Sequence, residues 1–292
     1  MGGSNLDFKR IEWIFFLAFL GVNLFLFNIY YEAREEQNIQ SRSNQKVSIE
    51  KRLKSEDIKV EGELSDEQLQ GYYLSGTPTN MVNALKNERN RTHNPKFLSE
   101  RTSLEDTVLN HRLLGDFYIS NPKQIGASIT NYLNKDNEVL FGKEYSYIPE
   151  WSKKDGDHHY IYAAQEYEGI PINDDSSRLV MTLENKTDLL ELTYYSQTHV
   201  SQLTPLREAM TLYSEEDAVN TLYVNNKIPA DATLKWRQLA YTLILDVRGK
   251  NVYVPAWFVA VETEDNGLQI ESVNAFTNRV ITNNTVQSVE NT

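Results

Sequence analysis

The longest apolar run of the chain lies near its N-terminus, from Trp13 to Tyr31. Its roughly 19 residues are about the length that one helix needs to cross the hydrocarbon core of a bilayer, at ~1.5 Å rise per residue. Lys9 and Arg10 precede the run and an acidic segment follows it. The positive-inside rule therefore places residues 1–10 in the cytoplasm and the rest of the chain outside. We predict one transmembrane helix, at residues 11–31, with its orientation set by Lys9 and Arg10.

A cleaved signal peptide is the alternative interpretation of this run. Signal peptides have a shorter apolar core, of ~7–15 residues, followed by a cleavage site with small residues. Here the run ends in NIYYEAREE, which contains no such site. The pattern therefore favours a retained anchor.

Two amides, Asn23 and Asn28, lie inside the apolar run. An amide without a partner in hydrocarbon costs a few kcal/mol, and a hydrogen bond to a neighbouring helix recovers part of that cost. Gly21 shares a helix face with Asn28, and glycine lets two helices approach closely. We expect Gly21, Asn23 and Asn28 to contact partner helices in the membrane. The alternative is that Asn23 bonds locally while Asn28 reaches the outer interface.

Beyond residue 110, one pattern of a helix followed by strands occurs twice. The first copy opens with the helical period of NPKQIGASITNYLN. The second opens with SEEDAVNTLYVNN, where Ser214 and Asp217 match a variant of the capping box. Three alternating runs follow each helix: HHYIYAAQEYEGIPI, RLVMTLEN and LLELTYYSQTHV in the first copy, and LKWRQLAYTLILDV, VYVPAWFVAVET and LQIESVNAFTNRVI in the second.

The fold class that follows is α+β, with two tandem modules at residues 111–203 and 204–292. Each module is predicted to hold one helix and an antiparallel sheet. Residues 32–110 are assigned to a stalk and an N-terminal extracytoplasmic segment. Within that segment, IKVEGELSDEQLQGYYLSG predicts one or two strands, and PTNMVNALKNERN predicts a helix that ends before Pro95. The aromatic residues of the predicted strands are expected to be core: Tyr160, Tyr162, Tyr167, Trp236, Tyr241, Trp257 and Phe258.

The composition of the chain argues against several classes of function. The net charge of −12 falls on the part after residue 31, because the charges before it sum to zero. This argues against binding to nucleic acid or to anionic lipid surfaces. The chain has no cysteine, which excludes disulfides, thiol catalysis and thiolate metal sites. A secreted domain without disulfides fits the exterior of a Gram-positive bacterium.

The residues that carry chemistry form no recognised catalytic or metal-binding motif. KKDGDHHY holds Asp155, Asp157 and two adjacent histidines, but neighbouring strand residues face opposite sides, so we interpret it as a turn before a strand. The pair Asp174–Asp175 is likewise interpreted as a turn. Three isolated histidines are interpreted as surface or hydrogen-bonded residues: His93, His111 and His199. We therefore predict no enzymatic activity, no cofactor and no metal site.

Three segments carry a resemblance to a known family: DFKRIEWIFFLAFLGVNLFLFNIYY, GYYLSG and EYEGIPINDDSSRLVMTLENKTDLLELTYYSQTHV. They resemble the YycI proteins of the YycH/YycI family of low-GC Gram-positive bacteria, accessory regulators of the WalK–WalR (YycG–YycF) cell-wall two-component system. The block from Glu215 to Ile281 is more weakly similar to a PepSY-type module. The resemblance implies a single-pass extracytoplasmic protein without catalytic activity. It would associate with the sensor kinase WalK/YycG and a YycH-like sister protein, partly through membrane helices.

Two other hypotheses stay open. One is a membrane-tethered ligand-binding module or protease inhibitor on the cell surface, which would use a Tyr-lined face of the sheets as its groove. The more distant one is an anchored hydrolase that depends on His158.

Overall fold

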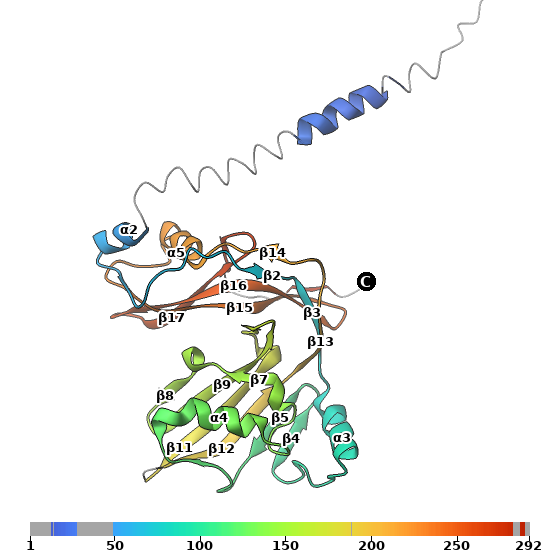
Figure 1. Ribbon diagram of the computed structural model, residues 1–292, viewed down its shortest axis with the longest axis vertical. Coiled ribbons are helices and arrows are strands. Elements are labelled where there is room, and N and C mark those ends of the chain that lie inside the picture. Colours follow the sequence, from blue (N-terminus) through green and yellow to red (C-terminus); the bar gives the residue numbers. More distant parts are fainter. Residues whose placement is uncertain (1–12, 14, 28–48, 188, 283–286, 290–292) are drawn as a thin grey trace, which may run out of the picture. The chain divides into compact units, whose positions relative to one another are not determined.

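The computed structural model describes residues 13, 15–27, 49–187, 189–282 and 287–289 (Figure 1). The chain divides into two units, residues 1–56 and 57–292. In the first unit, residues 13 and 15–27 are helical and α2 spans Ile49–Ser55. Among the described residues, no helix combines the length and the apolar character that a membrane crossing requires. The span predicted at residues 11–31 extends beyond the described positions at both ends, and it stays a prediction.

The second unit contains two large sheets, one of nine strands and one of eight. The nine-stranded sheet follows the order β10-β9-β11-β12-β5-β4. Its long central strands are β9 (His158–Tyr167), β11 (Arg178–Lys186) and β12 (Leu189–Thr198), which pair antiparallel as their alternation predicts. The shorter strands are β4 (Thr102–Glu105), β5 (Val108–Arg112), β6 (Tyr118–Ile119), β7 (Tyr145–Tyr147), β8 (Lys153–Asp155) and β10 (Ile170–Pro171).

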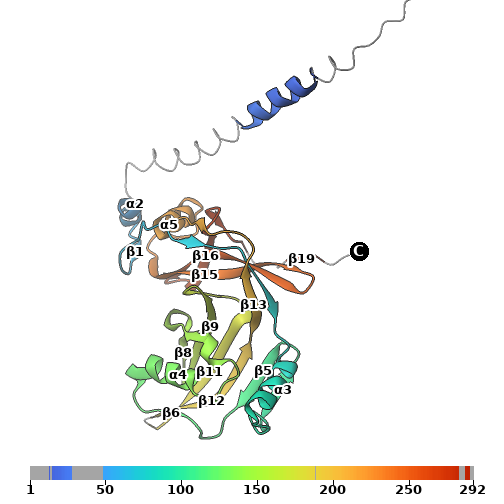
Figure 2. The ribbon, with the colours of Figure 1, turned by 45° about the vertical axis from the view of Figure 1, so that its right-hand side comes forward.

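Two helices bury their apolar sides in the core of this sheet. The predicted helix at NPKQIGASITNYLN is present as a 3-10 turn, η1 (Pro122–Gln124), followed by α4 (Ile125–Asn134) (Figure 2). The second helix, α3 (Met81–Thr92), ends at His93 in the left-handed region, before Pro95 as predicted. The shared core holds Met81, Leu85, Ile129, Tyr132, Leu133, Leu179, Met181, Leu183, Leu192 and Tyr195.

The eight-stranded sheet follows the order β1-β15-β16-β17-β18. Its strands are β1 (Lys59–Val60), β3 (Leu74–Pro78), β13 (Val200–Pro205), β15 (Thr233–Val247), β16 (Lys250–Thr263), β17 (Gly267–Asn274), β18 (Arg279–Val280) and β19 (Gln287–Val289). The predicted helix of the second copy is α5 (Glu215–Val224). Both hydrogen bonds of the capping box between Ser214 and Asp217 are present, which confirms that prediction. The remaining elements are the strand pair β2 (Gln70–Gly71) and β14 (Met210–Thr211), and the 3-10 turns η2 (Gly142–Glu144), η3 (Pro149–Trp151) and η4 (Asp175–Ser177).

The chain passes between the two sheets at two neighbouring places. It leaves the eight-stranded sheet after β3, forms α3 and the nine-stranded sheet, and returns directly from β12 into β13. β13 then pairs antiparallel with β3, so the outgoing and returning segments lie side by side. β1 and β3, from the segment assigned to the stalk and N-terminal region, thus belong to the sheet of the second predicted module. The predicted module boundaries themselves stay a prediction.

The expectation that all the strand aromatics are core is correct only in part. Tyr241, Trp257 and Phe258 are buried in the eight-stranded sheet. The others remain partly exposed: Tyr160, Tyr162, Tyr167 and Trp236. A half-buried sheet needs aromatic residues on its outer face as well as inside, and strand periodicity alone does not tell which face is covered.

Candidate functional site

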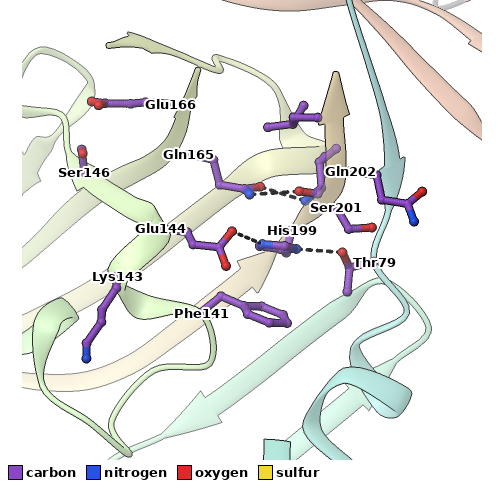
Figure 3. A pocket seen from close by; sticks show the side chains of 12 residues that line it. Thr79, Phe141, Lys143, Glu144, Ser146, Gln165, Glu166, His199, Ser201 and Gln202 are labelled. Atoms are coloured by element: carbon purple, nitrogen blue, oxygen red, sulfur yellow. Dashed lines mark hydrogen bonds and ion pairs between the residues drawn. The ribbon is translucent and has the colours of Figure 1, made fainter. Parts of the chain in front are cut away.

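A cluster of hydrogen-bonded polar side chains lies where the two passages between the sheets meet (Figure 3). His199 occupies the single position between β12 and β13, and Thr79 lies between β3 and α3. The Thr79 amide donates to the His199 carbonyl at 2.8 Å, and the Thr79 hydroxyl lies 2.7 Å from Nδ1 of His199. On the other side of the ring, Nε2 lies 2.9 Å from a carboxylate oxygen of Glu144. The result is a hydroxyl–imidazole–carboxylate chain built from three separate segments.

Each ring nitrogen of His199 therefore has one hydrogen-bond partner. Nδ1 is bonded to the Thr79 hydroxyl, and Nε2 donates its N–H to the carboxylate of Glu144, which can only accept. The ring of Phe141 stacks on the imidazole with 4.2 Å between centroids, and His199 is only 5% exposed. Hydroxyl, imidazole and carboxylate groups also occur in this order in nucleophilic enzymes. Here the same bonds tie the β3–α3 link, the end of η2 and the returning strand to one another.

Gln165 of β9 holds the returning strand from the other side. Its side-chain oxygen accepts from the Val200 amide at 2.8 Å and from the Ser177 hydroxyl at 2.7 Å. Its amide nitrogen donates to the Val200 carbonyl at 3.0 Å, and the whole residue is 3% exposed. Tyr145 adds a hydrogen bond from its hydroxyl to the Thr198 carbonyl. Residues 198–200 are thereby fixed by side chains of the nine-stranded sheet.

A cavity of about 580 Å³ opens beside this cluster. Its wall includes the hydrogen-bonded groups Thr79, Glu144 and His199, together with Lys143 and Glu166. The lining is predominantly polar and carries both signs of charge. A cavity of this kind suits a polar ligand or a polar side chain of another protein better than an apolar one.

The pairing with His199 lowers the pKa of Glu144 below its ordinary value of 4.5, mainly through the hydrogen bond. A carboxyl whose pKa is lowered by folding stabilises the fold above its ordinary pKa, and this contribution is lost as the pH falls through the lowered value. We expect wild type to be more stable than Glu144→Gln at pH 7, and the difference to shrink below pH 4.5. Urea unfolding of both proteins at a series of pH values measures this difference. An equal difference at pH 7 and pH 3 would show that the charge of Glu144 has no part in it.

The remaining residues considered in the sequence form turns or local bonds. Asp155 ends β8, and His158 and His159 begin β9 after a tight turn at Gly156, so the turn interpretation is confirmed. Asp174 caps η4 by accepting from the amide and the hydroxyl of Ser176, which confirms the second turn. No group of three or more potential metal ligands occurs in the described part of the chain.

The three isolated histidines have structural partners or positions. His93 terminates α3, His111 bonds to Thr102 at 2.8 Å, and His199 belongs to the cluster described above. The interpretation as surface or hydrogen-bonded residues is confirmed. Sequence reasoning missed only that His199 joins Thr79 and Glu144, because these residues are far apart along the chain and share no local spacing.

Of the predicted membrane contact residues, Gly21 and Asn23 lie in the described helix. The Asn23 side-chain amide donates to the Phe19 carbonyl at 2.9 Å, which is the local bond of the alternative interpretation. A Cβ added at Gly21 would meet no atom within 4 Å, so this face of the helix is open. Asn28, Lys9 and Arg10 lie outside the described residues, and the predicted contact with partner helices stays a prediction.

One face of the nine-stranded sheet carries a row of tyrosine and hydroxyl side chains. Tyr160 of β9 is opposite Thr182 of β11, which is opposite Tyr194 of β12, and all three are partly exposed. Lys153 lies over the ring of Tyr160, 5.6 Å from its centroid. Tyrosine is among the residues enriched in protein interaction surfaces.

Comparison with solved structures finds distant likenesses. A crystal structure of an uncharacterized protein from Eubacterium rectale ATCC 33656 has 10% sequence identity and a TM-score of 0.45, covering 78% of this chain and 91% of that one. The C-terminal domain of YpeB from Bacillus megaterium has 13% identity and a TM-score of 0.34, covering 73% of this chain and all of that one. Comparison with curated proteins finds no match.

Comparison with known protein families gives a match over most of the chain. The family described as YycI protein matches residues 36–276, which include the nine-stranded sheet, the eight-stranded sheet except β18 and β19, and the cluster around His199. A match of this extent is much longer than any single motif and covers the elements from α2 to β17. The chain therefore belongs to the YycI protein family, which has a role in regulating the YycG/WalK two-component system.

Proposed function

We propose that this protein is a membrane-anchored extracytoplasmic regulator of the sensor kinase WalK/YycG, without catalytic activity of its own. It acts by contacts with the kinase and with a YycH-like sister protein, and the N-terminal helix contributes to these contacts. The family match supports the role in regulating the two-component system. The apolar, exposed side chains of the N-terminal helix support the membrane anchor.

The observation that carries the anchor is the exposure of the N-terminal helix. Its described apolar side chains, from Trp13 to Phe27, include eleven large ones that are between 44% and 73% exposed. A helix that is apolar all round is stable where lipid or other protein surrounds it. The lysine and arginine before it orient such a helix with its N-terminus in the cytoplasm. The two sheets then lie on the outer side of the membrane.

The absence of catalysis is supported by the way the polar groups are used. In the cluster around His199, the imidazole is 5% exposed and Phe141 stacks on its ring. Gln165 is also buried, and both ends of its side-chain amide are bonded to backbone or to Ser177. These groups hold backbone segments in place rather than contact a substrate. This suits a protein that acts by binding other proteins through its surface.

Co-purification from detergent-solubilised membranes tests the proposal. The forms compared are the full-length chain, Asn23→Leu/Asn28→Leu, and a chain without residues 1–31. Leu20→Val/Leu24→Val is the matched control, because it changes the same helix without removing an amide. We expect kinase and sister protein to be retained by wild type and the control, and poorly by the other two forms. The amides lose interhelical hydrogen bonds worth ~0.6–2 kcal/mol, so the double variant should lose less than the truncated chain.

Other results distinguish the remaining possibilities. Loss of both partners from wild type itself would contradict the proposal. Equal retention by all four forms would place recognition in the sheets and leave Asn23 with only its bond to Phe19.

The alternative of a tethered ligand-binding module is favoured by one specific observation. Tyr160 and Tyr194 lie on one face of the nine-stranded sheet beside Thr182, and such tyrosines would suit the ligand-contacting face of this alternative. On this alternative, the kinase and the sister protein are not partners, so none of the four forms would retain them.

A further inference from the structure

A second cavity, of about 670 Å³, lies between the turn that carries η4 and the eight-stranded sheet. One wall comes from the nine-stranded sheet, from η4 with its neighbouring residues and from the turn before β5. The opposite wall comes from β15, β16 and the end of β3. None of these lining residues lines the cavity beside His199. A ligand here would therefore contact both sheets at a separate place.

Arg178 of β11 lies in the wall of this cavity, with its side chain 29% exposed. One terminal nitrogen of its guanidinium donates to the side-chain oxygen of Asn173 at 3.3 Å. The central carbon of the guanidinium lies over the ring of Tyr162, 5.7 Å from its centroid. Asn173 is itself held, because its backbone amide donates to the Tyr241 carbonyl at 2.8 Å. The guanidinium therefore has a defined position at the cavity.

The other terminal nitrogen of Arg178 lies 2.5 Å from a carboxylate oxygen of Asp175, whose side chain is 90% exposed. An ion pair with so exposed a partner is weak, because water and salt screen it. The backbone of Asp175 is fixed independently, since its carbonyl accepts from the Thr198 hydroxyl at 2.6 Å. The Asp175 side chain can thus rotate away and leave its place on the guanidinium to the carboxylate of a ligand.

Asp174 is the other carboxylate in the wall, and it is engaged within its own turn. Its Oδ1 accepts from the amide of Ser176 at 2.9 Å and from the hydroxyl of Ser176 at 2.6 Å. A ligand carboxylate would replace Asp175 at Arg178, so the charge beside the guanidinium would stay balanced. A carboxylate can also form two parallel hydrogen bonds with a guanidinium, which a cationic ligand cannot do.

Thr242 of β15 supplies a second polar group. The residue is 2% exposed and lies in the cavity wall, and its hydroxyl has no hydrogen-bond partner in the described part of the chain. A buried hydroxyl without a partner is unfavourable, and this one can donate to an acceptor in the cavity. The remaining wall beside it is apolar, with Val108, Leu243 and Phe258. A guanidinium, a hydroxyl and apolar side chains together suit a carboxylate that is joined to an apolar group.

We propose that this cavity binds a carboxylate joined to an apolar group, with Arg178 as its anchor in place of Asp175. A small free acid and the C-terminus of a peptide share this chemistry. The site goes beyond the proposed function and does not depend on its partners, because all the groups that form it belong to this chain.

Isothermal titration calorimetry on the full-length chain in detergent tests the site, with N-acetylleucine as the probe. N-acetylleucinamide keeps the apolar group without the charge, and N-acetylglycine keeps the charge without the apolar group. We expect N-acetylleucine to bind, and each of the other two to bind about tenfold or more weakly. The peptide acetyl-Ala-Ala-Leu with a free C-terminus distinguishes the two sources. Tighter binding than N-acetylleucine identifies a peptide C-terminus, and equal or weaker binding identifies a free acid.

Three variants assign the groups of the site. Arg178→Gln should weaken the binding of N-acetylleucine about tenfold or more, and Thr242→Val, which keeps the shape of the side chain, about threefold. Asp175→Asn should strengthen binding about threefold, because it removes the competing carboxylate. Arg112→Gln replaces an exposed arginine of the same sheet and should bind as wild type does. Thermal unfolding checks that each variant is folded.

The direction of the change in Asp175→Asn separates ligand binding from a purely structural role of the turn, since damage to the turn would weaken binding. Weaker binding by Asp175→Asn, unchanged binding by Arg178→Gln, or equal binding of N-acetylleucine and its amide would each overturn the inference. So would a folded wild-type chain that binds none of the probes. The co-purification of kinase and sister protein is a separate measurement, so failure of this site and failure of the proposed function are distinguishable.

Discussion

Replacing Arg237 by methionine is expected to lower the free energy of unfolding by about 3–5 kcal/mol. Arg237 lies on β15, and its side chain is 8% exposed. Its Nε donates to a carboxylate oxygen of Glu215 at 2.7 Å, and the Glu215 side chain is 13% exposed. The two other guanidinium nitrogens donate to the carbonyls of Glu61 and Glu63. The substitution would leave the largely buried carboxylate of Glu215 without its cationic partner, while the carbonyls of Glu61 and Glu63 belong to exposed residues that can bind water.

A second substitution separates the charge from the other contacts. The double variant Arg237→Met/Glu215→Gln no longer carries the unpaired carboxylate at position 215. We therefore expect its free energy of unfolding to lie between those of Arg237→Met and wild type. Lys235→Met is the neighbouring control: its partners Glu61 and Glu262 are about half exposed, and such surface pairs contribute ~0–1 kcal/mol. Urea unfolding of the four proteins measures these differences. Equal losses for Arg237→Met and Lys235→Met would mean that the Arg237–Glu215 pair is no more important than a surface pair.

Replacing Gln165 by leucine is expected to cost about 3 kcal/mol or more. The Val200 amide, the Val200 carbonyl and the Ser177 hydroxyl would each lose their partner, and a buried polar group without a partner costs ~1–3 kcal/mol. Leucine is close to glutamine in volume, so the loss reports on hydrogen bonding rather than on packing. We expect the lost hydrogen bonds to loosen the chain locally, where it returns from the nine-stranded sheet to the eight-stranded sheet.

The matched control is Gln124→Leu, an exposed glutamine whose side chain makes no capping bond at α4. We expect its free energy of unfolding to stay within ~0.5 kcal/mol of the wild-type value. Hydrogen exchange adds a spatial readout, because the Val200 amide should lose protection in Gln165→Leu while the amides in the middle of β16 keep theirs. Wild-type protection at Val200 in the Gln165 variant would contradict the assigned role of this network.

The elements of the second unit follow from local sequence because each depends on a short-range signal. The capping box of Ser214 and Asp217 fixes the start of α5, and Pro95 sets the end of α3. The alternation in β11 and β12 places their apolar residues on one face, where they meet α4. Such signals act within a few residues, so the sequence alone reveals them.

The pairing of distant segments is a different matter. Thr79, Glu144 and His199 come together only because β3 pairs with β13, and no local pattern records a contact between residues so far apart. The parallel pairing of β1 with β15 has the same origin, because Lys59 and Thr233 are far apart along the chain. The sequence by itself determined the apolar N-terminal run, the helices and strands and the absence of cysteine. Only the tertiary structure decided which strands are neighbours and which distant side chains meet, because those outcomes depend on packing and pairing between segments that local periodicity does not encode.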